Sequence, residues 1–125
     1  MGDDMKLDHV NIRTAKLGAM RAWYAEALGM TDGWRPPFPF GGAWLYAGDD
    51  PVVHLVEVDA RPDADAGDVR IEHFALSVDG DIDAFRKRLG DAGVEIMEAA
   101  VPGTNIVQLN IHDPDGNHIH VDFRV

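Results

Sequence analysis

The feature that most constrains this chain is an internal repeat. The segment LDHVNI at Leu7 matches IEHFAL at Ile71, an offset of 71 − 7 = 64, and Leu-Gly-Met at Leu28 matches Ala-Gly-Val at Ala92, again 92 − 28 = 64. The segments VVHLVEV and NHIHVDF align His54 with His120, an offset of 120 − 54 = 66, and a drift of two residues is the variation of one loop. The repeat predicts two copies of one supersecondary unit, packed against each other.

Each copy is predicted to contain a strand, a helix and three further strands. Apolar residues recur at spacings of three and four over 17–28 and 81–89, which predicts helices there. Alternating or short apolar runs predict the strands, at 6–12, 43–47, 52–58, 69–78, 94–98, 106–111 and 118–123. The Pro-rich stretch 34–42 is a loop or the irregular end of a strand, 59–68 is a polar surface connection, and DPDGN at 113–117 is a turn.

Composition excludes several classes of protein. With 125 residues, 46% of them hydrophobic and 26% charged, the chain suits one globular domain, 1–125. It has no cysteine, so disulfides, thiolate metal sites and cysteine nucleophiles are excluded. The formal net charge of −11 disfavours nucleic acid and anionic membranes as partners. No apolar run is long enough to span a bilayer and the N-terminus is too polar for a signal peptide, so a cytoplasmic location is expected by default.

Several of these segments together resemble the vicinal oxygen chelate superfamily, which includes glyoxalases, bleomycin-resistance proteins and extradiol dioxygenases. The resemblance covers nearly the whole chain and rests on LDHVNI, WYAEALGM, IEHFALSV, DAGVE and, most specifically, DPDGNHIHVDF. It implies an α+β fold in which two tandem βαβββ modules, 1–58 and 69–125, form a curved eight-stranded mixed sheet around an open cup. It also implies a small-molecule substrate bound in the cup, and a homodimer. Whether each cup closes within one chain or across two is left open.

Four of the six histidines occupy positions that the repeat makes equivalent. His9 and His73 lie on the first predicted strand of each copy, and His54 and His120 lie on the last. Alternation places their neighbours, such as Val53 and Leu55 or Ile119 and Val121, on the face that packs under the helices. The four imidazoles should therefore point the other way, into the cup.

In the family, these four positions carry the metal ligands, usually a mixture of His, Gln and Glu. The resemblance therefore implies that His9, His54, His73 and His120 bind one divalent ion. Four neutral imidazoles suit Zn, Ni, Fe, Co, Cu or Mn better than Mg or Ca. Metal held by three of the four, and a pocket without metal, remain as alternatives.

Other residues are candidates for the surroundings of the site. His118 and Asp122 share the cup-facing parity of His120, and are either partners of a ligating imidazole or members of a solvated strand end. The aromatic residues of 34–46 either roof a pocket for a planar ligand, contact a second copy or pack in the core. The substrate-binding candidates are Asn11, Phe38, Phe40, Trp44 and Tyr46.

Two functions compete at this stage. The first is a metal-dependent lyase, isomerase or oxygenase that chelates its substrate through neighbouring oxygens. The family's glyoxalases, ring-cleaving dioxygenases and thiol transferases use a Glu that His54 and His120 replace here, so no named reaction is favoured and no general base is identified. The second is a metal-free protein that sequesters a small molecule or drug, as the bleomycin-resistance relatives do.

Overall fold

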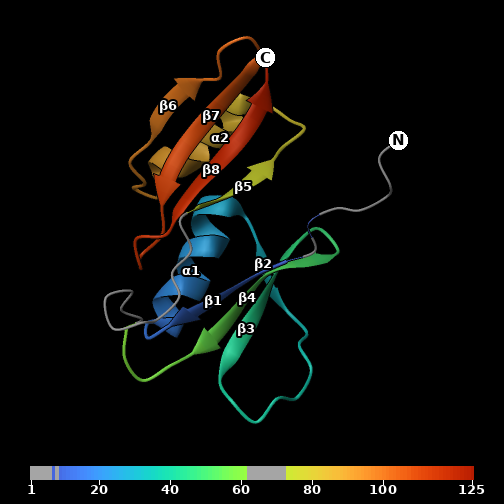
Figure 1. Cartoon of the computed structure of the whole chain (residues 1–125), viewed down its shortest axis with the longest axis vertical. Coiled ribbons are helices and arrows are strands. Elements are labelled where there is room, and N and C mark those ends of the chain that lie inside the picture. Colours follow the sequence, from blue (N-terminus) through green and yellow to red (C-terminus); the bar gives the residue numbers. More distant parts are fainter. Residues whose placement is uncertain (1–6, 8, 62–72) are drawn as a thin grey trace.

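The fold consists of two βαβββ units in tandem, seen in a computed structural model that describes residue 7 and residues 9–61 and 73–125. In Figure 1 the two sheets lie one above the other, with α1 near their junction and α2 behind the second sheet. The elements in chain order are β1 (Val10–Thr14), α1 (Leu17–Leu28), β2 (Thr31–Gly33), β3 (Gly42–Ala47), β4 (Asp50–Glu57), β5 (His73–Ser77), α2 (Ile82–Asp91), β6 (Met97–Ala100), β7 (Ile106–His112) and β8 (His118–Arg124).

The eight strands form two four-stranded mixed sheets with the same topology. Their strand orders are β1-β4-β3-β2 and β5-β8-β7-β6. In each sheet the first and last strands of the unit pair in parallel, and the other neighbours are antiparallel. The predicted tandem βαβββ fold is therefore confirmed, with the strands divided between two sheets.

The helices begin and end where local sequence favours it. α1 ends at Leu28 and is capped by Gly29, whose φ of 70° is a left-handed conformation that glycine adopts without strain. α2 begins after Asp81, whose carboxylate accepts hydrogen bonds from the backbone N–H groups of Asp83 and Ala84. The predicted bounds of α1 are confirmed, and α2 runs two residues beyond the predicted Leu89.

Alternation along the strands separates a core face from an open face in each sheet. Ile12, Val53 and Leu55 are buried in the first sheet, and Phe74, Ile119 and Val121 are buried in the second. Each set faces the helix of its own unit, so the predicted inward residues are confirmed. We call the opposite side of each sheet its open face.

The strand predictions differ from the structure mainly in the first unit. The short strand β2 lies just before the irregular segment predicted at 34–42, where no strand bounds were assigned, and β1 starts at Val10, later than the predicted Lys6. In the second unit β6 starts at Met97, three residues after the predicted Val94. Most of the polar connection at 59–68 and the start of the strand predicted at 69–78 lie outside the described residues.

The two units contact each other through their helices and through the turn at 113–117. α1 packs against α2. The buried Tyr24 of α1 donates a hydrogen bond of 2.8 Å from its hydroxyl to Asp113 Oδ2. At the end of β1, the Thr14 hydroxyl donates to Asp115 Oδ2, and nearby Lys16 Nζ donates to the Pro114 carbonyl at 3.2 Å. The turn between β7 and β8 is thus hydrogen-bonded to the first unit. No helix in the described part of the chain is long and apolar enough to cross a membrane.

Candidate metal and substrate site

The open face of the first sheet carries a stack of three rings. His54 on β4 lies between Trp44, its partner on β3, and His9, which precedes β1. The centroid of the His54 ring lies 4.0 Å from that of Trp44 and 3.9 Å from that of His9, and in both pairs the ring planes are nearly parallel. The stack leaves the His54 side chain only 9% exposed.

A hydrogen bond to the Pro51 carbonyl determines the tautomer of the neutral His54 ring. Its Nε2 lies 2.9 Å from the Pro51 carbonyl oxygen, which can only accept. Nε2 therefore carries the proton when the ring is neutral, and Nδ1 is the nitrogen with a lone pair. A carbonyl that fixes the tautomer in this way is typical of histidines that bind metals through the other nitrogen.

The open face of the second sheet carries the other histidines. The ring centroid of His73, on β5, lies 5.3 Å from that of His120 and 5.5 Å from that of His118, and both of these residues are on β8. His118 Nε2 lies 2.7 Å from Asn110 Oδ1, so the amide of β7 orients that ring. This face is therefore mainly polar, whereas the open face of the first sheet is mainly aromatic.

His120 and Asp122 form a close His–carboxylate pair on this face. Nδ1 of His120 lies 2.6 Å from Oδ1 of Asp122, and the two side chains are 14% and 21% exposed. The carboxylate accepts the Nδ1 proton and leaves Nε2 available as a ligand or base. Of the two interpretations of Asp122 from sequence, the structure favours a partner of His120.

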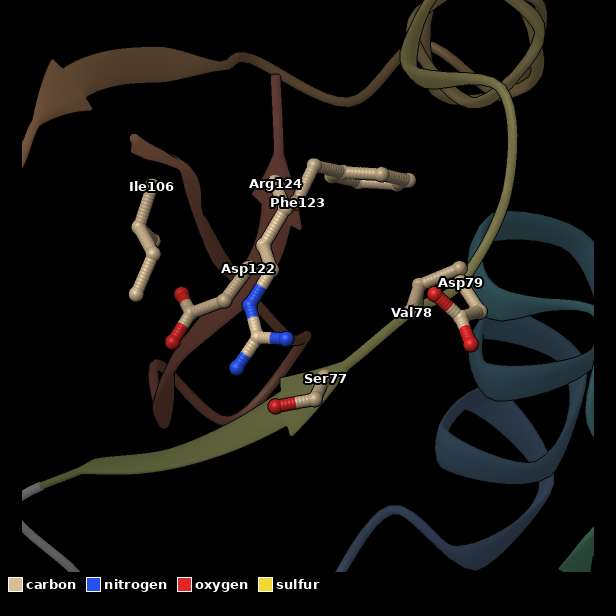
Figure 2. Close-up of a pocket in the computed structure, with 7 residues that line it drawn as sticks. All are labelled: Ser77, Val78, Asp79, Ile106, Asp122, Phe123 and Arg124. Atoms are coloured by element: carbon tan, nitrogen blue, oxygen red, sulfur yellow. The ribbon is translucent and has the colours of Figure 1, made fainter. Parts of the chain in front are cut away.

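Asp122 also lines a cavity of about 280 Å³ at the end of β5 and β8. Figure 2 shows the guanidinium of Arg124 between the Asp122 carboxylate and the Ser77 hydroxyl, while Asp79 lies farther away on the chain leading to α2. The cavity therefore adjoins His120 through Asp122 and presents both a cation and carboxylates.

A second, smaller cavity of about 120 Å³ lies on the first sheet. Four of the five predicted substrate-binding residues, Asn11, Phe38, Phe40 and Trp44, line it together with His54. The fifth, Tyr46, is not among the residues that line this cavity, and its hydroxyl donates to the Trp34 carbonyl at 2.5 Å. Arg35 also lines the cavity, and sequence reasoning missed it because a lone arginine in a Pro-rich loop carries no periodic signal.

The structure gathers the four predicted ligands as two pairs. Ring contacts join His9 to His54 and His73 to His120. Among the described residues, no group of three or more His, Asp or Glu has the geometry to hold a metal ion. The four-ligand centre therefore stays a prediction, and one chain by itself presents half of the set on each sheet.

The comparisons with known proteins identify the family. Residues 6–121 match the Glyoxalase/Bleomycin resistance protein/Dioxygenase superfamily, and the chain belongs to it. A search of curated proteins found no match.

Several solved structures share the fold over nearly their whole length. A glyoxalase-family protein from Bacillus anthracis is 23% identical, with a TM-score of 0.78 and coverage of 100% of this chain and 99% of that chain. Lactoylglutathione lyase from Agrobacterium tumefaciens is 18% identical, with a TM-score of 0.71 and coverage of 98% and 95%. A fosfomycin resistance protein from Listeria monocytogenes is 12% identical, with a TM-score of 0.70 and coverage of 100% and 96%.

Proposed function

We propose that this protein is a divalent-metal-dependent enzyme that acts on a small substrate with two neighbouring oxygens. The ion is held by His9, His54, His73 and His120. The observation that carries the proposal is that one histidine of each pair has a ring nitrogen hydrogen-bonded to the protein. His54 is bonded to a backbone carbonyl and His120 to a carboxylate. Such bonds fix the tautomer and orientation of a ligating imidazole.

The chemistry of the donor set fits a metal of the zinc, nickel, cobalt, copper, manganese or iron type. Neutral imidazoles bind these ions well and leave their double positive charge uncompensated by the ligands. A metal so held supplies Lewis-acid stabilisation of negative charge that develops on the substrate oxygens. The lack of a carboxylate ligand among the four favours a substrate that is itself anionic when bound.

The surrounding residues have separable roles in this proposal. Asp122 orients the His120 ring and favours the tautomer that carries its proton on Nδ1. Trp44 and Phe38 provide an apolar wall that excludes water from one side of the substrate. Asn11, on the same cavity wall as His54, supplies an amide that can donate to a substrate oxygen.

A second copy of the chain is expected to complete the site. Within one chain the two histidine pairs lie on different sheets, and the described residues do not assemble a group of three ligands. A homodimer in which the first sheet of one protomer faces the second sheet of its partner would bring one pair from each. By symmetry such a dimer contains two equivalent sites.

The reaction is proposed only at the level of class: a lyase, isomerase or oxygenase. The relatives named above include a lyase and a fosfomycin resistance protein, and both share this fold at low identity. The full set of imidazoles gives no carboxylate base at the metal, so proton transfer would fall to a histidine or to the substrate itself.

Metal content tests this proposal. Protein purified without a polyhistidine tag or chelator should contain about one divalent ion per chain by elemental analysis, as expected for two sites per dimer. A His73→Ala, His120→Ala double variant should lose nearly all of it. Tag-free wild-type protein that contains no metal, and takes up none on dialysis against zinc or nickel, would contradict the proposal.

A metal-free binding function is the second candidate, and one observation favours it. The aromatic cavity on the first sheet is lined by residues of one sheet and its adjoining loop, and His54 stacks on Trp44 at its wall. Such a cavity could retain a planar molecule without an ion. Ligand binding that is unchanged after metal removal, in protein isolated without metal, would favour this alternative.

A further inference from the structure

Arg35 is a cation held inside an aromatic loop. Its guanidinium carbon lies 5.3 Å from the ring centroid of Phe38 and 5.4 Å from that of Phe40, and these two rings stack at 5.1 Å. Nη2 donates a 3.0 Å hydrogen bond to the Phe40 carbonyl. A cation over aromatic faces is attracted by their electron density, so these contacts fix the position of the guanidinium.

The hydrogen-bonding capacity of this guanidinium is largely unused. Nε of Arg35 is buried and has no hydrogen-bond partner in the structure. None of the ion pairs between described residues includes Arg35, although the chain carries 22 Asp and Glu. A buried donor without a partner costs free energy, and more so when it is charged, unless a ligand satisfies it.

The cavity that Arg35 lines has the size and lining for a small planar anion. Its volume of about 120 Å³ is well below the roughly 300–1,000 Å³ of pockets for drug-sized ligands, so it suits one ring or a short unsaturated chain. Trp44 and Phe38 offer aromatic surfaces. The planar fork of an arginine matches the two oxygens of a carboxylate better than any other side chain does.

We propose that Arg35 and Trp44 form a subsite for the carboxylate of a planar, aromatic or unsaturated acid. Arg35 binds the carboxylate, and Trp44 packs against the adjoining ring or double bond. Because His54 lines the same cavity, the rest of such an acid would extend toward the histidines. The idea that this acid is the enzyme's substrate rests on the proposed function, whereas binding of its carboxylate by Arg35 requires no metal.

The test compares benzoate with benzamide, its neutral analogue of nearly the same shape. Both are titrated by calorimetry into chelator-treated wild-type protein and again after zinc is added. Wild type should bind benzoate about 10- to 100-fold more tightly than benzamide, as expected for hydrogen bonds to a charged partner. Arg35→Met should abolish this preference, and Arg35→Lys should retain a part of it.

Two control variants separate recognition from general effects. Arg21→Met removes the same charge from α1, where Arg21 pairs with Asp32, and should leave the preference intact. Trp44→Leu should weaken both ligands alike and preserve their ratio. The ratio of benzoate to benzamide affinity is measured within each variant. A general loosening of the loop in Arg35→Met would weaken both ligands and would not by itself change this ratio.

The outcomes keep this inference apart from the proposed function. A preference for benzoate that depends on Arg35 in metal-free protein supports the subsite even if no metal is ever bound. Equal affinity of wild type for benzoate and benzamide, or an unchanged preference in Arg35→Met, would overturn it.

Discussion

Asp122 is the residue on which the behaviour of His120 depends. The two residues are two positions apart on β8 and share the open face, so their side chains lie side by side along the strand. Their contact at 2.6 Å is a charge-assisted hydrogen bond when the carboxylate is ionised. In the proposed metal site, this bond would make Nε2 a better electron donor and would save the entropy of orienting the ring.

Replacing Asp122 by Asn should therefore weaken metal binding without removing a ligand. The expected loss is about 10- to 100-fold in affinity for zinc, as is typical for the partner of a ligating histidine. Competition with a chromophoric chelator measures it.

Asp79→Asn is the matched control, because Asp79 lines the same cavity and carries the same charge. Its zinc affinity should stay within about twofold of wild type, since long-range effects of an exposed charge are screened. Equal affinities of the two variants would show that Asp122 does not act through His120.

At the scale of elements, the turn at 113–117 does more than reverse the chain. Asp113 accepts hydrogen bonds from the backbone N–H groups of Asp115 and Asn117 and from the Asn117 side chain, which shapes the turn. The hydroxyl of Tyr24 adds a bond from the other unit. The buried first residue of this turn in the second unit, Asp113, thereby contacts α1 of the first unit.

Burial and the nearby Asp113 carboxylate hold the pKa of Tyr24 well above its usual value of 10.0. The folded state therefore keeps this proton at pH values where the unfolded state has lost it. A group with a raised pKa contributes its stability below the unfolded pKa and loses it as pH rises, so the Tyr24 contribution is lost above pH 10. The slope is about 1.4 kcal/mol per pH unit.

Tyr24→Phe should show both effects in urea unfolding. At neutral pH the free energy of unfolding should fall by about 1–3 kcal/mol, the cost of leaving a buried acceptor with one bond fewer. Above pH 10 the variant should lose stability less steeply than wild type.

Tyr46→Phe is the control for this prediction. Tyr46 is partly exposed and its hydroxyl bonds the Trp34 carbonyl within the first unit. Its removal should change stability at neutral pH by less than about 1 kcal/mol, as for a hydrogen bond that water can replace. If Tyr24→Phe behaves like Tyr46→Phe at both pH values, the contact between the units does not hold the fold together.

Elements with a strong local signal could be predicted, and those defined by their neighbours could not. α1 was predictable because its apolar spacing and Gly29 agree. β2 was not, because Thr31–Gly33 has no apolar alternation and is specified by pairing with β3, where Gly33 packs against the Tyr46 ring. Arg35 escaped notice for the same reason: its role arises from a loop whose shape no local pattern determines.

At the scale of the whole molecule, the repeat predicts equivalence but not arrangement. The offsets of 64 and 66 placed the histidines on matching strands, and the structure has the matching strand order in both sheets. How the sheets face each other depends on contacts between the units, such as Tyr24–Asp113. Such contacts do not follow the repeat, so the repeat cannot predict them. The pairing of His9 with His54 and of His73 with His120 emerged only from the structure.

The central claim is that histidines from both units, contributed by two copies, hold one divalent ion. Subunit mixing tests it directly. One variant carries His9→Ala and His54→Ala, and the other carries His73→Ala and His120→Ala. Each variant alone should bind almost no zinc, because every site in its dimer lacks one pair.

After the two variants are unfolded together and refolded at equal amounts, each mixed dimer should contain one site with all four histidines. Zinc binding should return to about a quarter of the wild-type capacity, since about half of the dimers are mixed and each has one of two sites restored. Mass spectrometry of the intact dimers should place the zinc in the mixed species. Zinc capacity that stays at the level of the separate variants, in a sample shown to contain mixed dimers, would contradict the account.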